Sequence, residues 1–537
     1  MNKLLPSSSA SLARAAATVT AAFLLSNLSG LVRQILVAQA FGTGAEIEAF
    51  NAANRVSETL FNLVAGGALA SAFIPTFSGL LARDDQEKAW RLASTIANLV
   101  LLVLIFLSLA TYLLAPEVVR YLLAPGFRSD PAKENLTIFL LRLMLPSAIL
   151  FALSGLVMGI LNSHQVFFIP ALTPSMYHLG MIFGVLVLAP TLGIAGLGWG
   201  VLIGAGLHLG VQIPSLLRLR GKYFPGFAWG LPEVYEVVRL FAPRLIGVAV
   251  VQLNFWVNTR LASRMPEGSV TGVVLAFALM LMPQAAIAQS VAIVTLPTLS
   301  THFALARTGE LRVTLVNALR GVLFLAVPAS VGLILLRKPI VATLYQRGAF
   351  DERSTEFVAW ALLWYASGLV GHSLVEVLAR SFYAMHDTRT PVLIGSIAMG
   401  LNVALSYLFS AIFQRVGWLP HGGLALANTL ATYLEALGLY GMMRRKLGEL
   451  REREIFLLAL QTALASLLMA GGIQLWMKFL AGAPVALISL GGVLVGGGLF
   501  LSLALLFRIE EVRVLWGVIL GQGLGSHQPH QLGNNDS

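Results

Sequence analysis

The chain has 537 residues, of which 57% are hydrophobic and only 11% are charged. Soluble domains carry about 25% charged residues, so the composition excludes a soluble enzyme, a nucleic-acid-binding protein and a disordered chain. Cysteine is absent, which excludes disulfides, thiolate metal sites and thiol catalysis. The net charge of +11 then indicates Lys and Arg retained in the cytoplasmic loops of a membrane protein.

Apolar runs long enough to span a bilayer recur along the whole chain. A spanning helix needs about 20 mostly apolar residues, and the sequence predicts about fourteen such helices with no soluble domain between them. Polar and Gly interruptions in the first two indicate that they face protein or a water-filled cavity. The tail over 514–537 is predicted to be disordered. The predicted helices are 15–41, 48–80, 92–114, 136–161, 167–190, 194–217, 234–262, 270–301, 313–336, 356–385, 390–413, 421–444, 454–478 and 484–508.

The start of the chain shares two features with a secretory signal. Lys3 and Arg14 precede an apolar run, and the stretch 38–40 resembles a cleavage site. Because Arg33 interrupts the run and no soluble domain follows, we interpret the segment as the first membrane helix. When the N-terminus is placed in the cytoplasm, the cytoplasmic loops hold roughly twice as many Lys and Arg as the opposite loops. This bias predicts that both termini are cytoplasmic.

Short stretches of the first half recur in the second half, in the same order. Pro75 in I-P-T-F-S and Pro297 in L-P-T-L-S lie 222 residues apart, and three further pairs have almost the same offset. Four such matches indicate an internal repeat. The matched pairs are Pro75 and Pro297, Pro116 and Pro339, Pro170 and Pro391, and Gly196 and Gly423.

The repeat predicts the domain organisation. Residues 1–222 and 223–450 would each form a six-helix lobe, followed by two additional helices within 451–513. Because six is even, both lobes have the same topology, and such parallel repeats are typical of transporters that bind substrate between lobes and rock around it. We therefore expect an all-α polytopic membrane protein with two parallel lobes and two C-terminal helices.

Polar side chains interrupt the second predicted helix, where a charge costs at least ~2.5–3.5 kcal/mol at the helix centre. Asn51, Arg55, Glu58 and Asn62 follow the i, i+4, i+7, i+11 spacing of one helix face. Such a stripe cannot face lipid, so we expect it to line a hydrated cavity with Arg33. The alternative is a structural ion pair between Arg55 and Glu58. Both interpretations can hold, with Glu58 setting the pose of Arg55.

The first helix of the second lobe carries a comparable polar set. Asn254 and Asn258 share a face, and Arg260 lies to one side. The alternative for Arg260 and Arg244 is a place near a helix end, from which the side chain reaches the interface. Guanidinium groups bind phosphate bidentately and stay protonated, which suits a pyrophosphate ligand.

The sequence shows no catalytic machinery. A Walker A stretch is absent, which excludes ATP hydrolysis by that route. His372 and Glu376 have i, i+4 spacing, but nothing completes an H-E-x-x-H motif, which favours a buried hydrogen-bonded His over a metal site. We expect no catalytic residue, no metal and no bound cofactor, with energy from the membrane potential or a coupled monovalent cation.

Several motifs resemble those of one transporter family. The stretch 379–392 reads A-R-S-F-Y-A-M-H-D-T-R-T-P-V, and 344–351 reads L-Y-Q-R-G-A-F-D. Shorter ones are A-P-G-F at 124–127, G-A before A-F-I-P at 67–75, and G-L-A-L-A at 423–427. Over about residues 15–508 they resemble the MurJ (MviN) family of lipid II flippases, in the multidrug/oligosaccharidyl-lipid/polysaccharide exporter superfamily.

The resemblance implies an inner-membrane transporter for lipid II, an undecaprenyl pyrophosphate that carries a disaccharide-pentapeptide. It would move lipid II from the cytoplasmic to the outer leaflet for peptidoglycan synthesis, as a monomer among membrane lipids and without nucleic acid. A cationic central cavity would hold the head group, and the helices within 451–513 would form a groove for the lipid tail. Arg33 matches the family's central arginine, and Glu48 matches the acid of its D-A-F motif.

The chain departs from the family pattern at several places. Asn27, Phe61 and Ala278 stand where the family has arginines, Phe277 replaces an acid, and the E-G-A motif reads G-G-A at 66–68. We hypothesise that Arg55 and Arg260 partly restore the positive field. The candidate substrate-binding residues are Arg33, Arg55, Arg260, Glu48, Asn27, Asn51, Glu58, Asn62, Asn254 and Asn258.

Other functions remain open at this point. The missing arginines keep a flippase for another polyprenyl-pyrophosphate-linked glycan, such as an O-unit or capsule unit, as the main alternative. A cation-coupled drug exporter usually has twelve helices and a cavity biased toward carboxylates, so two extra helices and the arginines argue against it. A membrane transferase would need a His or carboxylate cluster, which is missing. A noncatalytic scaffold would show no leaflet transfer in vesicles.

Overall fold

The computed structural model describes residues 9–64, 68–228 and 230–512, and these residues form helices and connecting loops without any strand. The predicted all-α class is confirmed. The predicted disordered tail over 514–537 and the first two positions of G-G-A at 66–68 lie outside the described residues. By contacts, the chain divides into two compact units, and each unit draws on distant parts of the sequence. Unit 1 is Met1–Ala278, Val341–Trp364 and Val392–Ala431, and unit 2 is Leu279–Ile340, Tyr365–Pro391 and Thr432–Ser537.

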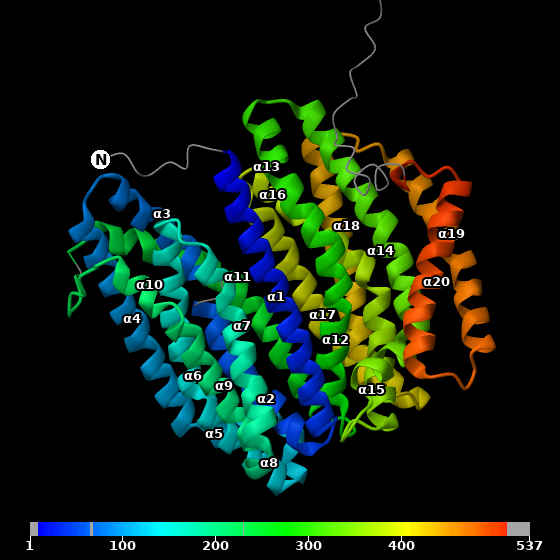
Figure 1. Cartoon of the computed structure of the whole chain (residues 1–537), viewed down its shortest axis with the longest axis horizontal. Helices are drawn as coiled ribbons and strands as arrows, with labels where there is room; N and C mark the ends of the chain where they lie inside the picture. The colour runs from blue at the N-terminus through cyan, green and yellow to red at the C-terminus, as the bar shows by residue number, and fades with distance from the viewer. Residues whose placement is uncertain (1–8, 65–67, 229, 513–537) are drawn as a thin grey trace, which may run out of the picture. The chain divides into compact units, whose positions relative to one another are not determined.

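Helices follow one another with short connections throughout (Figure 1). The first half contains α1 (Ser9–Phe41), α2 (Ala45–Val64), α3 (Ala68–Ala82), α4 (Gln86–Leu113), α5 (Ala115–Glu117), η1 (Val118–Leu123), η2 (Pro125–Ser129), α6 (Pro131–Ser163), α7 (Phe168–Phe183), η3 (Gly184–Leu188), α8 (Ala189–Leu192), α9 (Ile194–Gly210) and α10 (Ile213–Arg218). The second half contains α11 (Pro232–Ala262), α12 (Ser269–Gln284), η4 (Ala285–Gln289), α13 (Ser290–Ala304), α14 (Thr308–Tyr345), α15 (Glu352–Ser367), α16 (Leu369–Ala384), α17 (Arg389–Val416), α18 (His421–Leu447), α19 (Glu452–Phe479) and α20 (Val485–Leu506).

Many of these helices are suited to a bilayer. Within the described ranges, nine are long and apolar enough to cross a membrane, or ten if the bent pair α15 and α16 is one span. Helices α1, α2, α11 and α18 are not among them. The chain is therefore a multi-pass membrane protein, and the predicted number of about fourteen spans stays a prediction.

Several helices that were expected to be continuous are broken. The expected helix 270–301 is interrupted by the π-turn η4, the expected helix 167–190 by the π-turn η3, and the expected helix 356–385 divides into α15 and α16. The expected helix 48–80 corresponds to α2 and α3, and the residues between them, 65–67, lie outside the described residues. Pro283 lies just before η4. A proline inside a helix lacks an N–H and its ring displaces the carbonyl four residues earlier, and a wide turn relieves that clash. Hydrophobic periodicity does not report such breaks.

The internal repeat has a physical counterpart at two glycines. Gly196 is the third residue of α9, and Gly423 is the third residue of α18. A Cβ on Gly196 would lie 2.5 Å from the backbone nitrogen of Ala189, and one on Gly423 would lie 2.6 Å from the carbonyl carbon of Phe409. In both repeats, therefore, another backbone approaches the start of the helix so closely that only glycine fits.

Replacing Gly423 by alanine should destabilise the protein, because backbone atoms must shift to admit the methyl group. Overpacking of this kind costs about 1–3 kcal/mol, and Gly196→Ala should behave alike. The matched control is Gly400→Ala in α17, where a new Cβ meets nothing within 4 Å. Thermal unfolding of the purified variants measures the effect. Equal melting temperatures for Gly423→Ala and Gly400→Ala would show that the close approach is not real.

Each unit has its own apolar core. In unit 1, Phe73 and Phe77 stack with ring centroids 4.9 Å apart and pack among buried residues of α3, α4, α6 and α11. In unit 2, Phe324 of α14 and Phe500 of α20 lie 5.2 Å apart at the centre of a cluster that includes α19. The two C-terminal helices, which pack side by side (Figure 1), are therefore fastened to α14 by apolar contacts.

Candidate functional site

Helix α2 carries the predicted polar stripe. The Arg55 guanidinium donates to Oε2 of Glu58 at 2.8 Å, and Asn54 donates to Oε1 of the same carboxylate at 2.8 Å. The guanidinium also lies over the ring of Phe255 in α11, 5.0 Å from its centroid. The intrahelical ion pair is thus present, and it holds Arg55 in one pose against α11, as a cation–π contact requires.

Arg33 of α1 lies against α7. Its Nη1 is 3.3 Å from the Sδ of Met181, and the phenol of Tyr177 is a further neighbour. Its Nε is buried without a hydrogen-bond partner in the described part of the chain. Tyr177 is within electrostatic reach of Glu58 as well as Arg33, so the structure brings the two halves of the predicted site together around this tyrosine.

This cluster, which we call the arginine cluster (Arg33, Arg55, Glu58 and Tyr177), carries excess positive charge. Within the described residues, Glu58 pairs with Arg55 and Arg33 forms no ion pair, so the cluster has two guanidinium groups and one carboxylate. The Nε atoms of both arginines are buried and unpaired. Buried donors without partners are costly, so the cluster is arranged to receive hydrogen-bond acceptors that carry negative charge.

The other members of the predicted stripe lie at its ends. Asn51 donates from Nδ2 to Oγ1 of Thr271 at 3.0 Å, which ties α2 to α12. Asn62 is half-buried near the end of α2, and Asn27 is exposed on α1. Phe61, which stands at a family arginine position, packs against Phe151 with ring centroids 4.9 Å apart.

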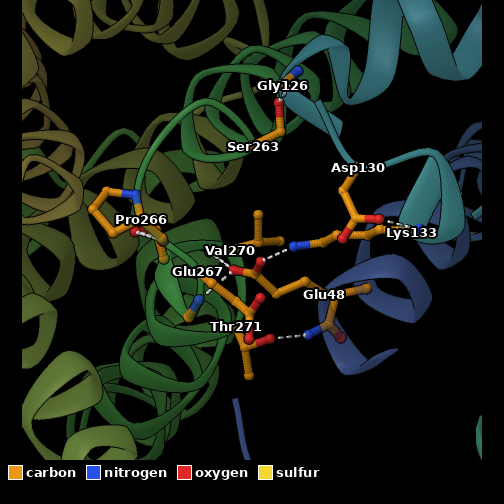
Figure 2. A network of polar contacts seen from close by, with 12 residues as sticks. Glu48, Gly126, Asp130, Lys133, Ser263, Pro266, Glu267, Val270 and Thr271 are labelled. Carbon is orange, nitrogen blue, oxygen red and sulfur yellow. Dashed lines mark hydrogen bonds and ion pairs between the residues drawn. The ribbon is translucent and has the colours of Figure 1, made fainter. Parts of the chain in front are cut away.

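A buried carboxylate joins three helices at one side of unit 1 (Figure 2). Glu48, in the first turn of α2 and 2% exposed, accepts from the Nζ of Lys133 in the first turn of α6 at 2.5 Å. Its Oε1 accepts from the backbone N–H groups of Gly268 and Val270, at 2.9 and 2.8 Å. These donors open α12 and have no partner within their own helix. Glu48 therefore caps α12 across 220 residues of sequence.

Close backbone contacts surround this carboxylate. The N–H of Gly126 donates to Oγ of Ser263, and a Cβ on Gly126 would collide with the carbonyl of the same serine at 2.0 Å. Gly42 has φ of +58° and approaches the carbonyl of Ala349 as closely, at 2.4 Å. We call the region of Glu48, Lys133, Gly126, Ser263 and Val270 the seam, because it joins the first repeat to the second.

Arg260 lies at this same side rather than in the arginine cluster. It is near the end of α11 and donates from Nη1 to the backbone carbonyl of Tyr121 in η1. Its guanidinium is thus hydrogen-bonded to the backbone carbonyl of Tyr121 in this structure. A role of Arg260 in restoring the positive field stays a prediction.

The two asparagines of α11 face α17. Asn258 donates to Oδ1 of Asn254 at 3.2 Å, so the two side chains share one helix face, and Ser406 donates to Oδ1 of Asn258 at 3.4 Å. Ser406 also donates to Asn402 at 3.0 Å. All four are buried, and Nδ2 of both Asn254 and Asn402 has no partner among the described residues. The sequence analysis did not connect Asn402 and Ser406 with this group.

Sequence reasoning also missed the partners that complete the other clusters. The partners are Lys133, Tyr177, Met181 and Thr271, and none of them carries a motif that indicates a contact with a distant polar residue. One available signal was Asp130, which accepts from the N–H groups of 132 and 133 and so places Lys133 in the buried first turn of α6.

Unit 2 contains an apolar cavity of about 410 Å³. It is lined by α14, α19 and α20, with Leu336, Met469 and Phe500 among its walls. Pro328 and Gly496 also line it, and no charged residue does. A dry, apolar cavity of this kind accepts hydrocarbon rather than a polar head group.

The stretch 379–392, the longest of the motifs that resemble the family, contains Asp387, whose contacts join three parts of the structure. Its carboxylate accepts from the N–H and Oγ1 of Thr390, at 3.0 and 2.8 Å, and from the Nζ of Lys446 at 2.7 Å. It thereby caps the start of α17 and fastens the end of α18 to it. These donors hold the pKa of Asp387 at about 2, below its ordinary value of 3.8, with the hydrogen bond from Lys446 contributing most.

Removing the ammonium group by Lys446→Gln should lower stability by at most about 1 kcal/mol at neutral pH, as for a largely solvated pair. A carboxyl whose pKa is depressed by folding stabilises the native state fully above its unfolded pKa. That contribution is lost as the pH falls from about 3.8 to about 2. The melting temperatures of wild type and variant should therefore converge over this range. Arg91→Gln, which breaks an exposed pair with Glu87, is the control with little effect at any pH; a pH-independent Lys446 effect would contradict the assignment.

Comparison with known proteins gives one consistent family. The family model described as "Lipid II flippase MurJ" matches residues 37–493. A lipid II flippase MurJ from Burkholderia cenocepacia is 31% identical over 439 residues, which are 81% of this chain and 84% of that protein. A probable lipid II flippase MurJ from Rhizobium tropici is 31% identical over 517 residues, 94% of each chain.

Solved structures agree with this comparison. A lipid II flippase MurJ in an inward closed conformation superposes with a TM-score of 0.77 at 26% identity, covering 91% of this chain and 98% of that one. An inward-facing multidrug transporter of the MATE family shares the fold, with a TM-score of 0.66 at 17% identity and coverage of 80% and 96%. The chain is therefore a transporter rather than an enzyme, and it belongs to the MurJ family.

Proposed function

We propose that the protein flips lipid II from the cytoplasmic to the outer leaflet of the bacterial inner membrane, with its pyrophosphate bound at the arginine cluster. The observation that carries this proposal is the excess charge of that cluster, where Glu58 pairs with Arg55 and Arg33 has no ion-pair partner among the described residues. A pyrophosphate supplies the missing acceptors, and guanidinium groups bind it bidentately. The names of the matched relatives support the choice of lipid II.

The seam supports alternating access. With both termini in the cytoplasm, the starts of α2, α6 and α12 lie at the outer face, so the seam is the outer gate. Glu48 and Lys133 are nearly excluded from water in this state, at 2% and 8% exposure. The head group would enter from the cytoplasm while the gate is closed and leave after the gate has opened.

The apolar cavity of unit 2 suits the lipid tail. Its volume of about 410 Å³ and its lining of aliphatic side chains and Phe500 match a polyprenyl chain. We assign the tail to this cavity between α14, α19 and α20, and the head group to unit 1. The working form is a monomer that contacts membrane lipids and needs no cofactor. Energy comes from the membrane potential or from a coupled monovalent cation.

Complementation of a flippase-depleted bacterium tests the proposal. The wild-type gene should restore growth, and Arg33→Ala with Arg55→Ala should not. Arg91→Ala, an exposed arginine paired with Glu87, is the matched control and should complement fully. Full complementation by the double variant would contradict the proposed head-group site. An added Arg260→Ala arm tests whether that residue contributes to the positive field.

A second substrate is favoured by one observation. Asn27, Phe61 and Ala278 replace arginines of the family, and Phe61 is committed to an aromatic contact with Phe151. Fewer cations suit a smaller or less acidic head group, such as an O-unit or a capsule unit on the same polyprenyl pyrophosphate. Competition between lipid II and an undecaprenyl-linked O-unit for transfer in vesicles decides between them.

A further inference from the structure

Within unit 2, α16 packs against the part of α18 that begins at Thr432. The hydroxyl of Tyr433 donates to the carbonyl of Ser367 at 2.8 Å, and a Cβ on Gly371 would lie 3.2 Å from the Tyr433 ring. Oγ1 of Thr432 is 3.4 Å from Nε2 of His372. Lys446 closes the pair at one end, over the ring of Phe382 and bonded to Asp387. The interface between these two helices is therefore well defined.

Glu435 places a carboxyl group in this interface at mid-membrane depth. Helix α18 has 27 residues and lies between the candidate membrane spans α17 and α19, and the proposal below places it across the bilayer. At 1.5 Å per residue, Glu435 lies about 20 Å from either helix end. Glu435 and Lys446 are eleven residues apart and share a helix face. Because Lys446 contacts α16, that face is the one that packs on α16.

The residues of α16 opposite Glu435 include one cation, and another carboxylate already binds it. Arg380 donates from Nη2 to Oε1 of Glu376, one helical turn away, at 2.6 Å. Tyr383 lies within electrostatic reach of Glu376, Arg380 and Glu435 together. Glu435 forms no ion pair within the described residues. Arg380 is thus paired with Glu376, and Glu435 has no ion-pair partner among the described residues.

In the described part of the chain, the other elements packed against α16 form no ion pair with Glu435. Both η4 and α13 pack on α16. His302 of α13 pairs with Glu310. On α14, Arg312 donates to the backbone carbonyl of Leu447 at the end of α18. An ionised carboxylate without a cation is costly at this depth, and such residues are typical of proton relays in transporters.

We propose that Glu435 is a proton-binding site, neutral while Arg380 is paired with Glu376. This inference deepens the proposed function, on which its role in coupling rests. When the guanidinium moves from Glu376 to Glu435, the proton on Glu435 leaves to water and Glu376 takes up a proton. The group of three therefore stays neutral in both arrangements, and one proton is bound at a different carboxylate in each.

Infrared difference spectroscopy of the purified full-length protein tests this without any transport step, so its failure is distinguishable from a failure of the flippase assignment. A protonated carboxylic acid has a C=O stretch that a carboxylate lacks. At neutral pH, where exposed Asp and Glu side chains are ionised, wild type should show this band and lose it on alkalinisation, and Glu435→Gln should lack it. Glu310→Gln, an exposed glutamate, is the matched control and should keep the band.

A second variant gives an independent prediction. Glu376→Gln leaves Glu435 intact but frees Arg380, which should pair with Glu435 and remove the acid band at the pH where wild type shows it. Persistence of the band in Glu435→Gln would assign it to another group and overturn the proposal. So would its absence from wild type at neutral pH, or its loss on adding sodium at that pH, which would indicate a metal cation instead.

Discussion

Glu48→Leu should abolish lipid transfer and lower stability by about 3–5 kcal/mol, the cost of leaving one partner of a buried ion pair without the other. The leucine leaves the ammonium of Lys133 buried and the N–H groups of Gly268 and Val270 without their acceptor. Since the seam is the proposed outer gate, its loss should also shift the protein toward an outward-open state. Thermal unfolding and labelling of a cysteine introduced at Thr271 measure the two effects.

The double variant separates charge from packing. Adding Lys133→Met to Glu48→Leu removes the unpaired ammonium and should recover much of the stability while transfer stays lost. Glu46→Leu, an exposed glutamate in the same helical turn, is the matched control and should behave as wild type. Wild-type stability and transfer in Glu48→Leu would show that the seam is neither a structural element nor a gate.

Neutralising the arginine cluster should have the second large effect, on lipid II affinity. A hydrogen bond to a charged group contributes about 1.5–3 kcal/mol, so Arg33→Gln and Arg55→Gln should each weaken binding about 10- to 150-fold. Equilibrium binding of lipid II to purified protein at two salt concentrations measures this. Arg33→Lys keeps the positive charge but loses the planar set of N–H donors of a guanidinium. Its affinity should therefore lie between those of Arg33→Gln and wild type.

Two neighbours provide the controls for that result. Tyr177→Phe keeps the ring beside Arg33 and should change affinity far less than loss of a guanidinium. Glu58→Gln removes the carboxylate that competes with a phosphate for Arg55, so affinity should rise rather than fall. If Arg33→Gln and Arg55→Gln bind lipid II as wild type does, the head group lies elsewhere.

The all-α fold class can be predicted from composition, because a segment that crosses a membrane must satisfy its backbone hydrogen bonds internally, and a helix does so. The repeat was also recognisable, and Gly196 and Gly423 show why its spacing persists: a second backbone occupies the space of a side chain at both. Helix breaks were not predicted, since η4 depends on how Pro283 is accommodated, and apolar periodicity is the same on either side.

The site was predicted one residue at a time, without its partners. Spacing places Arg55 and Glu58 on one face, and the structure shows their ion pair. Spacing does not show that Lys133 reaches Glu48 from 85 residues away, because that contact depends on where α6 begins. Arg260 looked equivalent to Arg55 in sequence, yet its position near the end of α11 gives its guanidinium a loop carbonyl as partner.

Leaflet transfer of lipid II in proteoliposomes tests the central claim most directly. The assay follows lipid II accessible to an impermeant reagent in vesicles that contain wild type, Arg33→Gln with Arg55→Gln, or Arg91→Gln. The account predicts transfer by wild type and Arg91→Gln, and transfer near that of empty vesicles for the double variant. Equal transfer by the double variant and wild type, or none by wild type with and without an imposed membrane potential, would contradict it.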